Sequence, residues 1–286
     1  MTVGMPLRTF AVVTDSTADL PPAIAEKRGV IVVPLTVTID GESYLDGILT
    51  QQQFFDRMNS SPTLPTTSQP PIGSFVEVYE RALEHAEQVV SVHISSRLSG
   101  TVESARAAAA QFPGRVHVFD SLNLSGALAW QVLDAVDSAD DGLSPQVAIE
   151  RLETVRAQAK LLVGLDSLDN LARGGRIGKV SAFLGGLLNY KVTLTVDESG
   201  AFAPLGRSRG DKAAVAFSLD WVAQKMGTST RGRFAVGHAL TPERAEAFAE
   251  AIRERYDVRD LIIYEAGSVV ATHTGTCWGI TVVPEG

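Results

Sequence analysis

The sequence contains a single cysteine, Cys277, among its 286 residues. One cysteine excludes an intramolecular disulfide and any cysteine-rich zinc site, and it fits a reducing compartment such as the cytosol. There is no apolar run of about 18 residues, the length that a membrane-spanning helix needs, and residues 1–9 lack the apolar centre of an export signal. We therefore expect a cytoplasmic protein without a transmembrane segment.

Positive charge is also scarce. Lys and Arg number 25 against 33 Asp and Glu, which gives a formal net charge of −8 at pH 7 and a pI near 5.2. A protein that binds nucleic acid or an anionic membrane needs a basic face for phosphate, so we expect no nucleic-acid partner. Hydrophobic residues make up 45% of the chain, which indicates a folded globular protein rather than a disordered one.

Several motifs of metal and cofactor sites are missing. The sequence has no H-E-x-x-H, no C-x-x-C and no G-x-G-x-x-G after a strand. The segment Gly174–Lys179 is not a Walker A loop, because three residues separate Gly174 from Gly178 and Val180 stands where Ser or Thr would hold Mg²⁺. We therefore expect no metal, no resident cofactor and no ATP bound by this chain itself.

The first 160 residues alternate short apolar runs with helical patterns. The predicted strands are 10–14, 30–38, 89–94 and 115–119, and the predicted helices are 21–28, 72–86, 101–111 and 126–137. This βαβ order predicts an α/β domain over residues 1–160, with a parallel sheet in a three-layer arrangement.

The pattern changes after a predicted helix at 144–158, and we place a domain boundary near residue 160. The elements expected over 161–286 are a strand at 161–165, a helix at 179–189, a hairpin over 190–207, a helix at 211–226, a strand at 233–238, a helix at 242–256, and strands near 259–265 and 279–283. Helices mixed with a hairpin predict a second domain that contains both element types.

Four loops are rich in hydroxyl side chains. Three of them follow predicted parallel strands and so meet at one edge of the sheet, where ligands bind in such folds. The loops are 15–17, 95–101, 120–125 and 65–70, and their candidate residues are Ser16, Thr17, Thr67, Ser68, Ser96, Ser99, Gly100 and Ser125. Hydroxyls and helix N-terminal amides donate neutral hydrogen bonds to an anion, and Arg97 is the only cation among these loops. This donor set favours a single delocalised charge such as a carboxylate. Helix capping and turn formation are the favoured explanation of any single loop, whereas the four loops together favour a binding site.

Two further segments are candidates for function. Gly174-Gly175 interrupts one predicted helix and Gly178 begins another, which indicates either an anion site with Arg176 or a structural turn. The predicted helix 179–189 mixes small and large apolar residues, which suits either a slot for an acyl chain or close helix packing. Of the five histidines, we single out His273, because it lies in a small-residue loop where an imidazole can reach a cleft.

Taken in order, six motifs resemble the signatures of the DegV family over about residues 10 to 283. They are Thr14–Leu20, Thr67–Pro70, Ser95–Thr101, Gly174–Lys179, Arg209-Gly210 with Lys212, and His273–Gly275. Members of this family bind fatty acids, and the best understood are the acyl-carrying subunits of bacterial fatty acid kinase. The resemblance implies a parallel-sheet N-terminal domain, a C-terminal α/β domain with a mixed sheet, and a long-chain fatty acid between them.

The resemblance also implies roles for single residues. Thr67 and Ser99 would bind the fatty acid carboxylate, with His273 close to it. Arg176 and Arg209 would face a separate kinase subunit, which holds ATP and Mg²⁺ and phosphorylates the acid to an acyl phosphate. The chain itself would be a non-catalytic substrate-binding subunit, and we expect it to be a monomer.

The chain departs from the family pattern at two places. Ala127-Leu128-Ala129 stands where the family usually has Gly-x-Gly, and Cys277-Trp278 replaces smaller residues, so we expect altered space for the acyl tail. Three alternative functions stay open: a lipid-binding or transport protein without a kinase partner, an acyl hydrolase that uses Ser99 with His273, and a protein that binds a small polar metabolite.

Overall fold

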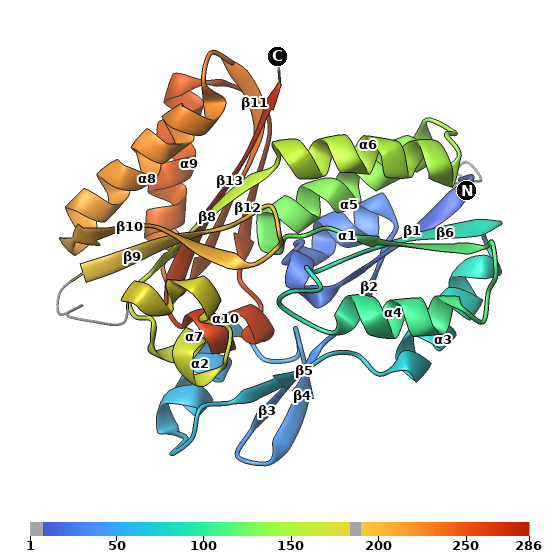
Figure 1. Cartoon of the computed structure of the whole chain (residues 1–286), viewed down its shortest axis with the longest axis horizontal. Coiled ribbons are helices and arrows are strands. Elements are labelled where there is room, and N and C mark those ends of the chain that lie inside the picture. Colours follow the sequence, from blue (N-terminus) through green and yellow to red (C-terminus); the bar gives the residue numbers. More distant parts are fainter. Residues whose placement is uncertain (1–7, 184–189, 286) are drawn as a thin grey trace.

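The computed structural model describes residues 8–183 and 190–285 (Figure 1). The N-terminal part contains β1 (Phe10–Asp15), the 3₁₀ turn η1 (Ser16–Ala18), α1 (Pro22–Arg28), β2 (Val30–Val33), β3 (Thr36–Ile39), β4 (Glu42–Leu45), α2 (Gln51–Ser60), β5 (Thr66–Ser68), α3 (Ile72–Leu83), β6 (Gln88–His93), α4 (Thr101–Ala109), β7 (Val116–Asp120), α5 (Ser125–Asp140) and α6 (Pro145–Gln158). The C-terminal part contains β8 (Lys160–Leu165), α7 (Asp169–Arg173), the 3₁₀ turn η2 (Gly178–Phe183), β9 (Tyr190–Val196), β10 (Phe202–Arg209), α8 (Gly210–Met226), β11 (Arg231–Ala239), α9 (Pro242–Arg255), β12 (Asp257–Glu265), α10 (Ser268–Thr274) and β13 (Cys277–Glu285).

The N-terminal part is built on a parallel sheet with the strand order β2-β1-β6-β7. Helices α3 and α4 cover one face, and α1 and α5 cover the other (Figure 1). Successive residues of a strand point to opposite faces, so Val12 joins the core shared with α5 whereas Val13 packs with Phe75 and Tyr79 of α3. The predicted parallel sheet between two helical layers is confirmed.

The C-terminal part is built on a six-stranded sheet with the order β10-β9-β8-β13-β11-β12. Only β11 and β12 pair in parallel, so the sheet is mixed, as the family resemblance implied. Helices α8 and α9 cover one face through Trp221 and Phe248. The first strand of this sheet, β8, begins at Lys160, and the division of the chain into domains near residue 160 stays a prediction.

Helix α5 packs against both sheets. It contacts β1 and β6 of the parallel sheet and β8, β11 and β13 of the mixed sheet, and 14 of its 16 residues are buried. A helix that is buried on all sides must be apolar or internally satisfied on all sides, and Ser138 meets this requirement by donating to the Asp134 carbonyl within the helix. Its first turn approaches the mixed sheet closely, because a Cβ on Gly126 would lie 2.7 Å from Thr281 Oγ1 and 2.8 Å from Ala235 Cβ.

The strand predicted at 30–38 is two strands in different sheets. Pro34 separates β2 from β3, and proline ends a ladder because it has no N–H to donate. β3 then pairs with β4 and β5 in a small antiparallel sheet. The strands β4 and β5 and the helix α2 are not among the predicted elements, and Thr67 lies in β5, opposite Val37 of β3.

Two expectations about the C-terminal part need correction. The loop expected around His273 is the helix α10. The segment predicted as a helix over 179–189 begins with the 3₁₀ turn η2, whereas its residues 184–189 lie outside the described residues, together with the suggested acyl slot. Across residues 8–183 and 190–285, no helix combines the length and apolar character needed to cross a membrane.

The close approach of α5 to the mixed sheet gives a test of the fold. We expect Gly126→Ala to lower the free energy of unfolding by about 1–3 kcal/mol, because the added methyl overpacks the contact with Thr281 and Ala235. Gly73→Ala in α3 is the matched control, since nothing lies within 4 Å of its added Cβ, and it should be neutral or stabilising by up to about 1 kcal/mol. Urea unfolding measures both variants, and equal effects would contradict the proposed close packing.

Candidate ligand-binding site

A cavity of about 320 Å³ lies where the parallel sheet, β5 and α10 meet. Its size is in the range of small-molecule sites. Its lining residues come from both parts of the chain: Thr17, Leu35, Thr67, Ser68, Gln69, Ile94, Leu98, Ser99, Leu124, Arg176, Phe202, Val269, Val270, His273 and Thr274. The list combines hydroxyl, amide, imidazole and guanidinium groups with seven apolar side chains, so the cavity suits a ligand that has a polar group on an apolar body.

Thr67 and His273 meet at the polar part of the cavity. Thr67 Oγ1 lies 2.8 Å from His273 Nε2, although the two residues are 206 positions apart. Burial, and then the nearby Arg176, lower the pKa of His273 to about 4, so its ring is neutral at pH 7. A neutral ring serves as a hydrogen-bond partner for Thr67 and brings no charge of its own.

The glycine motif and the histidine motif pack against each other. A Cβ on Gly174 would lie 2.4 Å from His273 Nδ1, so only glycine leaves room for the ring in this position. Arg176 Nη1 donates to the Gly174 carbonyl at 2.8 Å, and Arg176 Nε donates to the Leu98 carbonyl at 3.4 Å. The turn that admits His273 is therefore tied to the loop that carries Ser99.

The loop after β6 presents Ser99 at the cavity. Ser99 Oγ lies 2.8 Å from Thr101 Oγ1 and accepts from the Thr101 amide at 3.3 Å, at the start of α4. Gly100 lies against Gln69, since a Cβ there would be 2.1 Å from the Gln69 side-chain oxygen. The glycine thus lets the Ser99 loop and the Gln69 loop approach each other.

The apolar lining continues toward the mixed sheet. A second void of about 20 Å³ shares Leu124, Phe202, Val270 and Thr274 with the main cavity and reaches Tyr264 and Cys277. Burial raises the pKa of the Cys277 thiol to about 12, so this cysteine is unreactive and forms part of the apolar wall.

Of the two bulky residues at 277–278, only Cys277 belongs to the core on the cavity side. Trp278 lies in the core beneath α8 and α9 and donates its indole N–H to Ser218 Oγ at 3.1 Å. Its ring covers Gly164 of β8, where a Cβ would lie 1.9 Å from the indole. Trp278 is also among the residues that line the small void, so the altered space for the acyl tail stays a prediction.

The structure brings most of the candidate residues together, but not all. Thr17, Thr67, Ser68, Ser99, Arg176 and His273 line the main cavity, and Ser125 lines the small void. Four candidates lie outside both linings: Ser16 accepts from the Leu35 amide, Gly100 lies against Gln69, Ser96 is exposed, and Arg209 is exposed at the end of β10. Arg97 is also exposed, and the cation that lines the cavity is Arg176.

Two buried carboxyl groups that the sequence analysis did not single out fix α10. Asp19 accepts from the Gly267 amide at 2.8 Å and bonds to Ser125 Oγ at 2.5 Å. Asp46 accepts from the Val269 amide at 3.4 Å. Burial raises the pKa of Asp19 to about 8 and also raises the pKa of Asp46. Asp19 follows Thr17 by two residues, and in the sequence it has no feature that distinguishes it from an ordinary turn residue.

A serine hydrolase does not fit this site. Ser99 bonds to Thr101 and His273 bonds to Thr67, so the pair expected for hydrolysis is not formed. The sequence Gly206–Gly210 does have the G-x-S-x-G pattern, which the sequence analysis missed. Its Ser208 lies inside β10 opposite Lys191, not on a sharp turn, and among the described residues no hydrogen bond joins it to a histidine.

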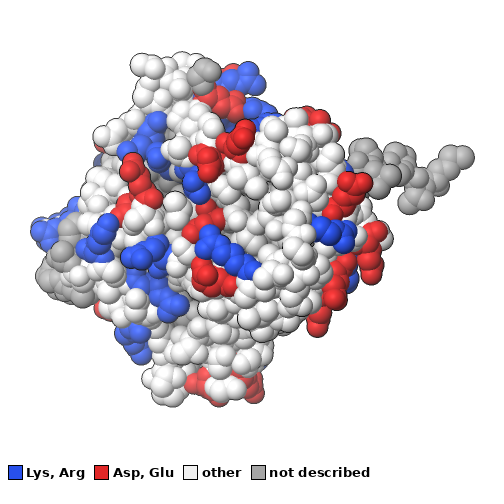
Figure 2. Space-filling model, turned by 45° about the vertical axis from the view of Figure 1, so that its right-hand side comes forward, with Lys and Arg blue, Asp and Glu red and all other residues white. Residues whose placement is uncertain are grey.

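The charged side chains around the site are unevenly distributed. Figure 2 shows Lys and Arg gathered on the side of the mixed sheet and Asp and Glu along the opposite margin. Exposed cations of the C-terminal part near the glycine motif and β10 include Arg173, Lys179, Arg209 and Lys212. In the described part of the chain, no three His, Cys, Asp or Glu side chains are grouped to hold a metal ion.

Comparison with known proteins links this arrangement to one family. The family model described as "Uncharacterised protein, DegV family" matches residues 9–285. A DegV domain-containing protein of Deinococcus radiodurans is 40% identical over 268 residues, which cover 93% of this chain and 95% of the relative. A DegV domain-containing protein of Streptococcus pneumoniae is 32% identical over 273 residues, or 95% of this chain and 97% of the relative.

Solved structures give the same result. A DegV family protein from Thermus thermophilus, described by its fatty acid binding, has a TM-score of 0.91 and 37% identity, with 96% of this chain and 99% of that chain covered. DegV from Bacillus subtilis, described as a fatty acid binding protein, has a TM-score of 0.87 and 32% identity, with 97% and 100% covered.

The buried carboxyl group of Asp19 predicts a pH dependence of stability. Its pKa in the folded chain, about 8, is above the ordinary value of 3.8, so the folded state holds this proton more tightly than the unfolded state. The stability from this group is therefore complete at acidic pH and is lost as the pH rises toward and through 8. We expect the free energy of unfolding to fall less between pH 5 and pH 9 in Asp19→Asn than in the wild type, as measured by urea titrations at each pH.

The control for this prediction is Asp220→Asn, which changes an exposed carboxylate on α8. It should follow the wild-type pH profile. If Asp19→Asn also followed the wild-type pH profile, the interpretation of Asp19 as a buried carboxyl group that is protonated in the folded chain would be wrong.

Proposed function

The chain belongs to the DegV family, and we propose that it binds one long-chain fatty acid and fixes its carboxylate for phosphorylation by a separate kinase subunit. The observation that carries the proposal is a cavity with hydroxyl donors at one part of its wall and an apolar path that continues toward the mixed sheet. The solved relatives described as fatty acid binding proteins support the choice of ligand.

The carboxylate would bind between Thr67 and Ser99. If the neutral His273 donates through Nε2 to Thr67 Oγ1, the Thr67 hydroxyl hydrogen is free to donate to the ligand. A hydrogen bond to a charged group contributes about 1.5–3 kcal/mol net. Arg176, which also lines the cavity, supplies one positive charge for the acid.

The tail would supply most of the affinity. Burying a methylene contributes about 0.8 kcal/mol, so a tail of about fourteen could contribute on the order of 10 kcal/mol before the entropy losses of binding. This total exceeds the contribution of the two hydroxyl groups. The tail therefore sets the affinity, and Thr67 and Ser99 set the orientation of the head group.

The phosphorylation step assigns the chemistry to the partner. A carboxylate oxygen attacks the γ-phosphorus of ATP held with Mg²⁺ by the kinase, the bond to ADP breaks, and an acyl phosphate forms. Arg176 and Arg209 would face the kinase, because guanidinium groups stabilise the charge that spreads over a transferring phosphoryl group. A cytoplasmic location is part of this proposal, since the partner needs ATP.

The main alternative is a lipid carrier without a kinase. It predicts the same bound acid but no acyl phosphate when kinase and ATP are added. Mass spectrometry of organic extracts of the purified chain tests the ligand directly, because a tightly held fatty acid should co-purify. Recovery of a small polar metabolite in place of a fatty acid would contradict the proposal.

The head-group assignment predicts a separation of binding from turnover. We expect Thr67→Ala with Ser99→Ala to retain fatty acid, through the tail, while acyl phosphate formation with the kinase falls by about a hundredfold or more, since two bonds of about 1.5–3 kcal/mol each are removed. Ser96→Ala, in the same loop but outside the cavity lining, is the control and should keep wild-type turnover. Undiminished turnover of the double variant would refute the assignment.

The kinase-facing role of Arg209 predicts a different pattern. We expect Arg209→Ala to bind fatty acid with wild-type affinity, because the side chain lies outside the cavity lining, and to be phosphorylated more slowly at a given kinase concentration. Arg253→Ala on α9 removes an exposed arginine elsewhere and should match the wild type. Equal phosphorylation rates for Arg209→Ala and Arg253→Ala would contradict the placement of Arg209 on the kinase-facing surface.

A further inference from the structure

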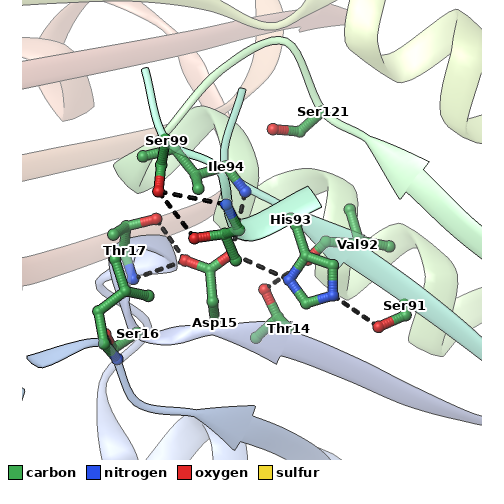
Figure 3. Close-up of polar contacts among 12 residues, drawn as sticks. Thr14, Asp15, Ser16, Thr17, Ser91, Val92, His93, Ile94, Ser99 and Ser121 are labelled. Carbon is green, nitrogen blue, oxygen red and sulfur yellow. Dashed lines mark hydrogen bonds and ion pairs between the residues drawn. The ribbon is translucent and has the colours of Figure 1, made fainter. Parts of the chain in front are cut away.

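A line of four buried polar side chains lies on the α3 face of the parallel sheet, and the proposed function uses none of them. His93 Nδ1 lies 3.0 Å from Asp15 Oδ2, and His93 Nε2 lies 2.6 Å from Ser91 Oγ (Figure 3). Ser91 Oγ in turn lies 2.9 Å from the hydroxyl of Tyr79 on α3. All four side chains have zero exposure. Burying polar groups costs free energy unless each finds a partner, and a fully paired line of this kind holds its side chains in one arrangement.

The order Ser91, His93, Asp15 has the hydrogen-bond pattern of a catalytic triad. None of the three residues lines the cavity, and none is accessible to solvent. A substrate has no path to Ser91, so this arrangement does not perform nucleophilic catalysis.

Asp15 connects two strands at the point where they separate. The β1–β6 ladder ends at the pair Thr14 and Val92. Beyond this pair the Asp15 carboxylate accepts from the Thr17 amide at 3.0 Å, the Thr17 hydroxyl at 2.5 Å and the Ile94 amide at 3.0 Å, in addition to its bond with His93 (Figure 3). The Asp15 side chain thus takes the place of the backbone hydrogen bonds between β1 and β6 where the edge of the sheet borders the cavity.

Both residues that Asp15 holds belong to the cavity wall. Thr17 and Ile94 line it, and Ile94 begins the loop that carries Ser99. That loop turns at once, because the amides of Leu98 and Ser99 donate to the Ser95 carbonyl at 2.9 and 3.1 Å. A displaced Ile94 would therefore displace Ser99.

We propose that His93 is a positioning residue for the ligand carboxylate, which it orients through Asp15 and the Thr17 and Ile94 segments. The inference rests on the proposed function. The Thr17 hydroxyl hydrogen is committed to Asp15, so Thr17 offers no hydroxyl donor to the head group. The carboxylate is consequently directed to Thr67 and Ser99, and Ser99 is held in place for it.

The test compares palmitate with hexadecanol, which has the same tail length but no carboxylate. In His93→Leu, the preference for palmitate, taken as the ratio of the two Kd values, should fall by about tenfold, as expected for loss of one well-placed bond to a charged group. His93→Asn offers an amide nitrogen near the position of Nδ1 and should restore the ratio to within about threefold. Tyr79→Phe removes only the far end of the line and should leave the ratio unchanged.

A purely structural role gives a different result. If His93→Leu weakened palmitate and hexadecanol equally and preserved their ratio, the positioning role would be overturned. If circular dichroism shows that His93→Leu does not fold, Asp15→Asn tests the proposal in its place. Its side-chain amide must turn the N–H₂ group toward some of the donors that Asp15 now binds, which disturbs the same contacts. An unchanged ratio of the two Kd values in Asp15→Asn would overturn the proposal. A wild-type chain without preference for palmitate would instead refute the carboxylate site itself.

Discussion

The burial of α5 between two sheets is the constraint on which the rest of the structure depends. A helix that contacts β1 and β6 on one side and β8, β11 and β13 on another fixes the distance between the parallel and the mixed sheet. Its N-terminus lies where the loop after β7 ends, and Gly126 lets it touch the mixed sheet directly. The cavity borders the start of this helix at Leu124, where the loops of the parallel sheet meet β5, the first residue of β10 and α10.

Around the cavity, the carboxyl groups of buried acids accept hydrogen bonds from backbone N–H groups, in place of strand pairing. Asp15 joins the ends of β1 and β6, while Asp19 and Asp46 hold the start of α10 through the amides of Gly267 and Val269. Each acid accepts at least one backbone N–H that no ladder reaches, which offsets part of the cost of burying it. The wall of the cavity is therefore fixed without further secondary structure, and its opening does not weaken the sheets behind it.

Periodicity made most of the fold predictable, and it also located the hydroxyl loops, because carboxyl ends of parallel strands always share an edge. The remaining elements are those that periodicity does not report. β4 has four residues and is largely exposed, and α10 has seven residues of which several are β-branched, so neither carries a distinct pattern. The contact between Thr67 and His273 spans 206 positions, and the fit of Gly174 to that ring depends on tertiary packing alone. The G-x-S-x-G of β10 illustrates the converse, since a matching pattern there lies inside a strand and has no catalytic geometry.

The wall of the cavity draws on residues from Thr17 to Thr274, and this span has a consequence for the chain during its synthesis. Chains emerge from the ribosome with the N-terminus first, and domains fold as units as they appear. The parallel sheet and Thr67 are complete early, whereas α10 follows twelve strands and nine helices in the order of the described elements. A nascent chain that has not yet reached α10 lacks His273, so the complete wall of the cavity forms only after α10 has been synthesised.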